Sequence, residues 1–172
     1  MISKMMHRIL IGLLFAYIGY FLPVAFAEQP TGVSFQKGAS IDKKAPEFSL
    51  EDIKGDKVNL KELCGKPILL KFWTSWCPFC RKEIPKVNKL YEDYSQKGLV
   101  ILAIDIEETK AKISSFAQKQ NIKYKILFDL DGEVAKSYEV MGVPTYVLID
   151  KDCLIRYTGN SRPERTLIEK LL

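Results

Sequence analysis

Residues 71–85 read KFWTSWCPFCRKEIP, and they join an apolar run to a helical pattern through two cysteines spaced two residues apart. The overlapping run KPILLKFW (66–73) is typical of a strand buried inside a sheet. From the second cysteine onward, apolar positions recur at helical spacing: Cys80, Ile84, Val87 and Tyr91. Cys77 is therefore expected at or near the N-terminus of a helix, where unpaired N–H groups and the helix dipole favour a thiolate.

The Cys77–Cys80 pair raises three alternatives: a metal site, a stabilising disulfide or an electron-exchanging centre. Cys80 follows Cys77 by about one helical turn, on the inner face. This placement predicts an exposed nucleophile at Cys77 and a shielded resolving thiol at Cys80. A disulfide between them would close so short a loop that it would add little stability. Redox exchange is therefore the favoured interpretation.

The composition disfavours several other kinds of site. The only histidine is His7, so Cys-His proteases, Ser-His-Asp hydrolases and histidine-ligated zinc or copper sites are disfavoured. Cys64 and Cys153 each stand alone, whereas a zinc ribbon needs a second Cys-x-x-Cys. Without Lys4 and Arg8 the chain has 24 basic and 21 acidic residues, a net charge of +3, and the charges are interspersed. We expect no cofactor, no metal and no nucleic-acid partner.

The N-terminus has the pattern of a targeting segment. A short positive stretch (1–8) precedes ILIGLLFAYIGYFLPVAFA (9–27), which carries no charge and ends in small residues around Phe26. Residues 1–27 are interpreted as a signal peptide cleaved after Ala27, with an uncleaved membrane anchor as the alternative. Both interpretations place the rest of the chain at the periplasmic or extracytoplasmic side, where disulfides persist.

The remaining sequence divides into a flexible lead-in (28–44) and one domain (45–172). The pattern predicts two short strands within 48–60 around a turn at 54–56. After the first helix, strands and helices alternate, which implies a mainly parallel sheet covered on both faces. Strands are expected at 99–105, 124–129, 145–150 and 154–159, and helices at 109–120, 132–140 and 163–172. The last two strands, joined by a tight turn, are expected to be antiparallel.

FWTSWCPFC, Pro85 and the later GVPT (142–145) together resemble the thioredoxin fold. The lead-in APEFSLEDIKGDKVNLKELCGKPILLKFW (45–73) is similar to that of exported TlpA/ResA-like thiol–disulfide oxidoreductases. Pro78 and the ending LIRYTG resemble the CcmG/DsbE branch, which acts in cytochrome c maturation. The resemblance implies an α/β thioredoxin-like fold: a central mixed sheet flanked by helices, with an N-terminal β-hairpin extension.

The resemblance also implies roles for residues near the cysteines. It implies a cis Val143–Pro144 bond facing the cysteines, with Val143 offering backbone hydrogen bonds to a substrate; a plain proline at a strand start is the alternative. Glu83 matches a buried glutamate that relays protons to the thiols, with an exposed helix glutamate as the alternative. Lys71 departs from the pattern, because related proteins place Asp or Asn there. Pairing with Lys71 would keep Glu83 ionised and weaken the relay hypothesis.

The resemblance further implies a direction of electron flow and a set of partners. It implies a reductant that receives electrons from a membrane donor of the CcdA/DsbD type and reduces protein disulfides, such as those of apocytochrome c. A periplasmic dithiol oxidase, a peroxiredoxin-like antioxidant and a copper(I) metallochaperone are the alternatives. Thr74 fits a peroxiredoxin, but Leu70 stands where that family has a proline. A copper chaperone of the Sco type would have a wider cysteine spacing and a histidine.

Two further expectations concern residues around this centre. Trp73 is expected in the core, whereas Trp76 is expected to shield the sulfurs and form a flat apolar docking surface. In the thioredoxin arrangement, Cys64 and Cys153 both fall in loops at the sheet edge opposite the active site. A Cys64–Cys153 disulfide is therefore expected, with two unpaired thiols as the alternative.

Overall fold

The computed structural model describes residues 40–172. The predicted signal peptide or anchor (1–27) and most of the predicted lead-in lie outside the described residues. Within residues 40–172, no helix is both long enough and apolar enough to cross a membrane.

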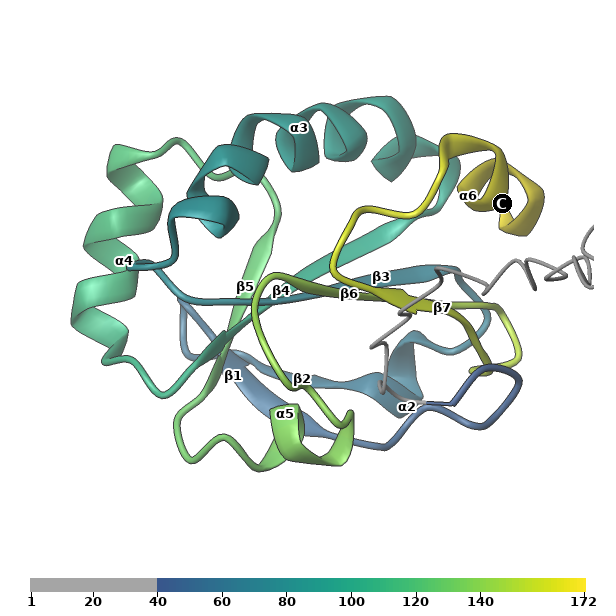
Figure 1. The fold of residues 1–172 in the computed structure, drawn as a ribbon, viewed down its shortest axis with the longest axis horizontal. Coiled ribbons are helices and arrows are strands. Elements are labelled where there is room, and N and C mark those ends of the chain that lie inside the picture. The colour runs from purple at the N-terminus through teal and green to yellow at the C-terminus, as the bar shows by residue number, and fades with distance from the viewer. Residues whose placement is uncertain (1–39) are drawn as a thin grey trace, which may run out of the picture. The chain divides into compact units, whose positions relative to one another are not determined.

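The described domain is built on one seven-stranded sheet with the strand order β2-β1-β5-β4-β3-β6-β7 (Figure 1). In chain order the strands are β1 (Ser49–Asp52), β2 (Lys57–Asn59), β3 (Ile68–Trp73), β4 (Val100–Ile106), β5 (Lys125–Asp129), β6 (Thr145–Ile149) and β7 (Ile155–Gly159). The sheet is mixed: β3, β4 and β5 pair in parallel, and the other four pairings are antiparallel. The mixed thioredoxin-like sheet with its N-terminal hairpin is confirmed. The expectation of a mainly parallel sheet is wrong, because β1 pairs with β5 and β6 pairs with β3 in antiparallel fashion, in addition to the two hairpins.

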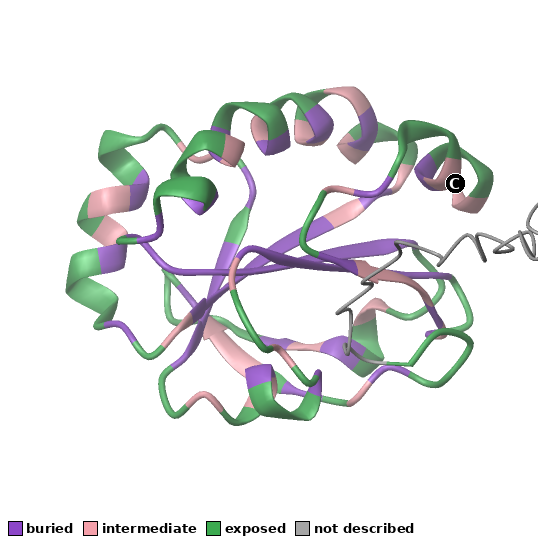
Figure 2. Cartoon of the chain, viewed as in Figure 1, coloured by how far each residue is buried: buried purple, intermediate pink, exposed green. Residues whose placement is uncertain are grey.

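β3 is the strand that positions the cysteines. It pairs with β4 on one side and β6 on the other, and all six of its residues are buried (Figure 2). Phe72 lies opposite Thr145 near the active-site end, and Ile68 lies opposite Ile149 at the far end. Because successive strand residues point to opposite faces, Leu69 and Trp73 pack in one core layer while Ile68 and Phe72 pack in the other.

Helices cover both faces of the sheet (Figure 1). Buried residues of α3, α4 and α6 pack with Leu69 and Trp73, and buried residues of α2 and α5 pack with Ile68 and Phe72. The helices are α2 (Leu60–Leu63), α3 (Pro78–Tyr94), α4 (Lys110–Lys119), α5 (Glu133–Ser137) and α6 (Arg165–Leu171), with a 3₁₀ turn η1 (Ser95–Lys97) after α3. The sequence did not predict α2, because a single turn is too short to show a helical period.

The described residues begin before the predicted domain boundary at residue 45, and they contact β7. Asp42 donates its N–H to the Ile155 carbonyl at 2.8 Å, and Ile155 donates its N–H to the Lys43 carbonyl at 2.9 Å. Two residues that the sequence assigned to the lead-in are therefore hydrogen-bonded to the first residue of β7. They satisfy backbone groups at the start of β7 that would otherwise be open to solvent.

Candidate active site

Cys77 is the N-cap residue of α3, and Pro78 occupies the first helical position, where its missing N–H costs nothing. The Cys77 Sγ accepts the backbone N–H of Cys80 at 3.3 Å, so the sulfur takes the place of a capping oxygen. The partial positive charge at the helix start faces this sulfur. The predicted position of Cys77 at the junction of a buried strand and a helix is confirmed.

The exposure of the two cysteines differs less than the sequence predicted. Cys77 is 4% exposed and Cys80 is fully buried, so the expectation of an openly exposed nucleophile is wrong. The neighbouring apolar side chains of Trp76, Phe79 and Met141 are instead exposed, by 65%, 70% and 86%. Trp76 therefore lies where it can form part of a docking surface, while Trp73 is in the core as expected.

Cys80 is held as a thiol. Burial, and then the hydrogen bond with Cys77, raise its pKa to about 12. A thiol with such a pKa is almost entirely protonated at neutral pH, and it must lose its proton before it can attack a disulfide. The surroundings of Cys80 therefore favour its protonated form at neutral pH.

The loop before β6 faces Cys77. The Val143–Pro144 peptide bond is cis, as the resemblance implied, and the Val143 carbonyl accepts a hydrogen bond from the Cys77 thiol at 3.5 Å. The Asn160 amide donates to the Pro144 carbonyl at 2.9 Å, and the Thr145 hydroxyl donates to the Gly142 carbonyl at 2.6 Å. These bonds fix the loop against the cysteine and the end of β7.

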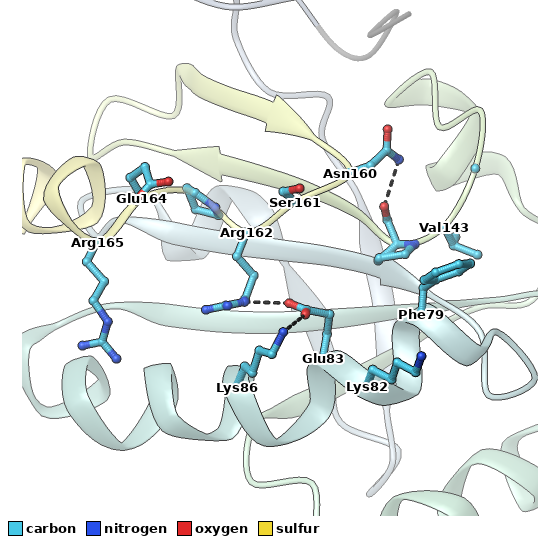
Figure 3. Close-up of a pocket in the computed structure, with 13 residues that line it drawn as sticks. Phe79, Lys82, Glu83, Lys86, Val143, Asn160, Ser161, Arg162, Glu164 and Arg165 are labelled. Carbon is cyan, nitrogen blue, oxygen red and sulfur yellow. Dashed lines mark hydrogen bonds and ion pairs between the residues drawn. The ribbon is translucent and has the colours of Figure 1, made fainter.

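A groove of about 970 Å³ runs from this loop between α3 and the chain that follows β7 (Figure 3). Phe79 and Val143 lie at one end of the groove, where Val143 also contacts Cys77, and Arg162 lies along its wall. Asn160 and Arg162 were not foreseen from the sequence, because neither belongs to a motif and both reach the site only through the path of the chain after β7.

Glu83 lines this groove. Its carboxylate accepts hydrogen bonds from Arg162 Nε at 2.6 Å and Lys86 Nζ at 2.8 Å (Figure 3). Burial alone would raise the pKa of Glu83, but these hydrogen bonds and charges outweigh it and hold the pKa below its ordinary value. The expectation of a raised pKa, on which the proton-relay role depended, is therefore wrong.

Lys71 does not pair with Glu83. Its side chain is fully buried, and its Nζ donates to the Cys80 carbonyl at 3.2 Å. Among the ion pairs of residues 40–172, those of Glu83 are with Lys86 and Arg162. Glu83 is thus kept ionised by two groups that the sequence did not suggest, and Lys71 lies beneath Cys80.

A second set of residues supports the loop that precedes Cys77. The Glu108 carboxylate accepts the Ser75 N–H at 2.5 Å and the Ser75 hydroxyl at 2.8 Å, and it pairs with Lys112. Asp105, at the end of β4, is buried beside Glu108 and has a pKa of about 9, raised by burial and then by Glu108. Acidic residues at the end of a buried strand are the sequence signal for this support.

Cys64 and Cys153 are joined by a disulfide in the structure, with their Cα atoms 5.5 Å apart. Cys64 ends α2 just before β3, and Cys153 lies in the turn between β6 and β7. The Gly65 N–H donates to the Lys151 carbonyl at 2.8 Å, so the two loops are also held by a backbone hydrogen bond. The disulfide closes the sheet end opposite Cys77, where the thioredoxin arrangement placed both residues.

No group of three or more His, Cys, Asp or Glu side chains in residues 40–172 is placed to hold a metal ion. A helix-capping cysteine, a buried second thiol and a cis proline facing them define a thioredoxin-like thiol–disulfide oxidoreductase. Residues 41–158 match the AhpC/TSA family model, and the chain belongs to this family.

Relatives and solved structures agree with this class. The thiol-disulfide oxidoreductase ResA of Bacillus cereus (strain ATCC 10987 / NRS 248) is 40% identical over 119 residues, which are 69% of each chain. The thioredoxin domain of a thiol-disulfide oxidoreductase from Bacteroides vulgatus superposes with a TM-score of 0.70, covering 77% of this chain and 99% of that one, at 24% identity. A secreted Mycobacterium tuberculosis disulfide oxidoreductase homologous to E. coli DsbE superposes with a TM-score of 0.61 at 25% identity, covering 72% of this chain and 92% of that one.

Proposed function

We propose that this thiol–disulfide oxidoreductase works outside the cytoplasm as a reductant of protein disulfides, such as those of apocytochrome c during cytochrome c maturation. Cys77 is the attacking thiol, Cys80 the resolving thiol, and Trp76, Val143 and Pro144 receive the substrate. A membrane electron donor of the CcdA/DsbD type returns the pair to its reduced state.

The reaction follows from the arrangement of the two sulfurs. The Cys77 thiolate attacks one sulfur of a substrate disulfide, and the other substrate sulfur leaves as a thiolate that takes up a proton. Cys80 then loses its proton and attacks the Cys77 sulfur of the mixed disulfide. The second substrate thiolate leaves, the Cys77–Cys80 disulfide forms, and two electrons have passed to the substrate.

One observation carries these roles. The Cys77 Sγ caps α3 and accepts the Cys80 N–H, whereas burial raises the pKa of Cys80 to about 12. The first sulfur is therefore placed to attack at the start of the helix, and the second is kept protonated until a mixed disulfide forms. The Val143 carbonyl beside Cys77 lies where an extended substrate segment could pair with the backbone.

Export and the choice of substrate are supported by other observations. The uncharged run at 9–27 has the pattern of a signal peptide, and the Cys64–Cys153 disulfide suits an oxidising compartment. One structural neighbour is described as secreted and homologous to DsbE. Pro78 and the LIRYTG ending resemble the branch that acts in cytochrome c maturation.

The roles of the cysteines are tested by alkylation of the reduced protein. At neutral pH, Cys77 should react with iodoacetamide at least about tenfold faster than Cys80, because Cys80 is buried and its pKa is raised. The labelled peptides are quantified by mass spectrometry, with the urea-unfolded protein as the control for intrinsic reactivity. Equal rates in the folded protein, or faster labelling of Cys80, would overturn the assignment.

The direction of electron flow is tested by equilibrating the Cys77–Cys80 couple with glutathione or dithiothreitol. A reductant should have a potential nearer that of thioredoxin (about −270 mV) than that of DsbA (about −120 mV).

Reduction of insulin should be abolished in Cys77→Ala, and Cys80→Ala should accumulate mixed disulfides. A potential near the DsbA value would favour a dithiol oxidase, and tight copper(I) binding without reductase activity would favour a metallochaperone.

A further inference from the structure

A lysine lies in the centre of the sheet, directly beneath the redox pair. Lys71 is the fourth residue of β3, between Ala103 of β4 and Tyr146 of β6. Its side chain is fully buried, whereas every other lysine in residues 40–172 is exposed. Burying an ammonium group costs several kcal/mol unless nearby groups compensate, so such a position calls for a physical explanation.

The surroundings of Lys71 compensate its charge only in part. Leu69 and Trp73, two residues away on either side, pack in the layer that faces α3, and the alternation of the strand directs Lys71 the same way. Its Nζ donates to the Cys80 carbonyl at 3.2 Å and lies 5.5 Å from the Trp73 ring centre and 5.9 Å from that of Tyr124. A carbonyl and two ring faces are weak substitutes for water or a carboxylate.

The ionisable groups that face Lys71 come from three directions. Cys80 and Glu83 lie on α3 and Cys77 caps it, Tyr124 precedes β5, and Tyr146 lies on β6. Burial raises the pKa of Tyr124 and of Tyr146, which keeps both phenols neutral. Glu83 is engaged by Arg162 and Lys86.

The cysteine sulfurs are therefore the groups near Lys71 that change charge during the reaction. Burial lowers the pKa of the Lys71 ammonium to about 8, while the charges of Cys80, then Glu83 and Cys77, oppose this shift. The influence is reciprocal. The Lys71 charge lowers the pKa of Cys80, although burial raises that pKa by more. The cation and the resolving sulfur thus favour each other's charged forms.

We propose that Lys71 is a positioning residue for the resolving step, and that its buried ammonium stabilises the Cys80 thiolate as this sulfur attacks the mixed disulfide on Cys77. The inference rests on the roles of Cys77 and Cys80 proposed above. In this step Cys80 gives up its proton to solvent, a Cys77–Cys80 bond forms, and the bond between Cys77 and the substrate sulfur breaks. The negative charge that appears on a buried sulfur would be costly without a cation nearby.

The resolving step can be followed separately by mixing the reduced protein with one equivalent of 5,5′-dithiobis(2-nitrobenzoate). The first nitrothiobenzoate is released when Cys77 forms the mixed disulfide, and the second when Cys80 resolves it. Lys71→Met should slow the second release at least about tenfold at neutral pH and shift its pH profile upward by at least about one unit. The first release should change much less, because Cys77 caps α3 independently of Lys71.

Thermal unfolding of the same variant separates this role from a structural one. Met fills a similar volume without a charge, so Lys71→Met should fold and be as stable as the parent or more stable. Lys66→Met is the matched control, because Lys66 is an exposed lysine just before the far end of β3, and both of its releases should match the parent. A stable Lys71→Met protein whose second release overlays the parent at every pH would overturn the proposal.

Cys80→Ala tests the underlying roles separately. It should release only one equivalent of nitrothiobenzoate, because the mixed disulfide on Cys77 can no longer be resolved. Release of two equivalents would show that Cys80 is not the resolving thiol, and the roles proposed above would fail. One equivalent from Cys80→Ala, together with a parent-like Lys71→Met, would refute the role of Lys71 alone.

Discussion

Glu83 and Cys80 lie one turn apart on α3, yet their surroundings change their pKa values in opposite directions. Cys80 points into the core, and burial with the Cys77 hydrogen bond raises its pKa to about 12. Glu83 lies in the groove, where Arg162 and Lys86 hold its pKa below the ordinary value despite partial burial. The spacing of the two residues is visible in the sequence, but Arg162 reaches Glu83 from 79 positions away.

The ionised state of Glu83 leads to a prediction about stability. Glu83→Gln should lower the free energy of unfolding by about 1 kcal/mol at pH 7, because the charge-assisted bonds to Arg162 and Lys86 are weakened. An acid with a lowered folded pKa stabilises the fold above its unfolded pKa, and this contribution is lost as pH falls through the folded value. The difference between variant and parent should therefore vanish near pH 3.

Urea unfolding between pH 3 and pH 7 measures this difference, and Arg162→Gln is the paired variant that should show a similar loss. The rate of disulfide exchange near neutral pH should depend on pH in the same way in Glu83→Gln and in the parent. A shift of that profile in the Gln variant would restore the proton-relay role and show that Glu83 is not simply an ionised partner of Arg162 and Lys86.

At the scale of elements, the carboxyl end of β4 holds a buried acid beside the active-site loop. Asp105 is 1% exposed, and neither of its carboxylate oxygens accepts a hydrogen bond within the described residues. The pKa of its neighbour Glu108 is lowered, so that carboxylate is ionised. It accepts a hydrogen bond from Ser75 and forms an ion pair with Lys112. One carboxyl group therefore keeps its proton while the other binds the loop that leads to Cys77.

The raised pKa of Asp105, about 9, makes stability depend on pH with a definite sign. Between about pH 4 and pH 9 the folded state keeps a proton that the unfolded state has lost, so this group makes the free energy of unfolding fall as pH rises. Asp105→Asn removes the titrating carboxyl group but keeps a side chain of nearly the same shape. The variant should be more stable than the parent at pH 9, with the gap closing toward pH 4.

Chemical unfolding of both proteins at pH 5, 7 and 9 checks this expectation. Asp131→Asn is the control, because Asp131 is exposed and its substitution should leave the pH profile of stability parallel to that of the parent. Parallel profiles for Asp105→Asn and the parent would mean that Asp105 ionises normally in the folded protein.

At the scale of the whole molecule, the two ends of the sheet have different roles. Cys77 and the Val143–Pro144 loop lie beyond the end where Phe72 pairs with Thr145. Cys64 and Cys153 lie at the other end, beyond the pair of Ile68 with Ile149. The redox pair and the disulfide are thus separated by the length of β3, which fits a structural role for the second pair.

The Cys64–Cys153 disulfide spans 89 positions, and loop-closure entropy assigns about 4 to 5 kcal/mol of stability to a loop of that size. Cys64→Ser, Cys153→Ser and the double variant should each lose about 2 to 5 kcal/mol in chemical unfolding, and the double variant should lose no more than the singles. Their Cys77–Cys80 exchange chemistry at low temperature should be preserved. Peptide mapping without reductant should recover a linked 64–153 peptide, whereas free thiols at both positions would contradict the assignment.

The sequence by itself determined the redox motif, the start of α3 and the strand that leads into it. These features are local: a buried strand, a capping cysteine and a proline at the first helical position follow from residues within one short stretch. The motif GVPT placed the second functional loop because proline and its neighbours are recognisable without knowledge of distant contacts. Both hairpins followed from their short turns.

Only the tertiary structure decided the state of the groups around the cysteines. Cys77 is nearly buried because the Val143 loop folds against it, and Glu83 is ionised because the chain after β7 brings Arg162 to it. Lys71 lies under Cys80 because the strand alternation directs it toward α3. A pKa depends on desolvation and on charges brought close by folding, and neither is encoded in sequence spacing alone.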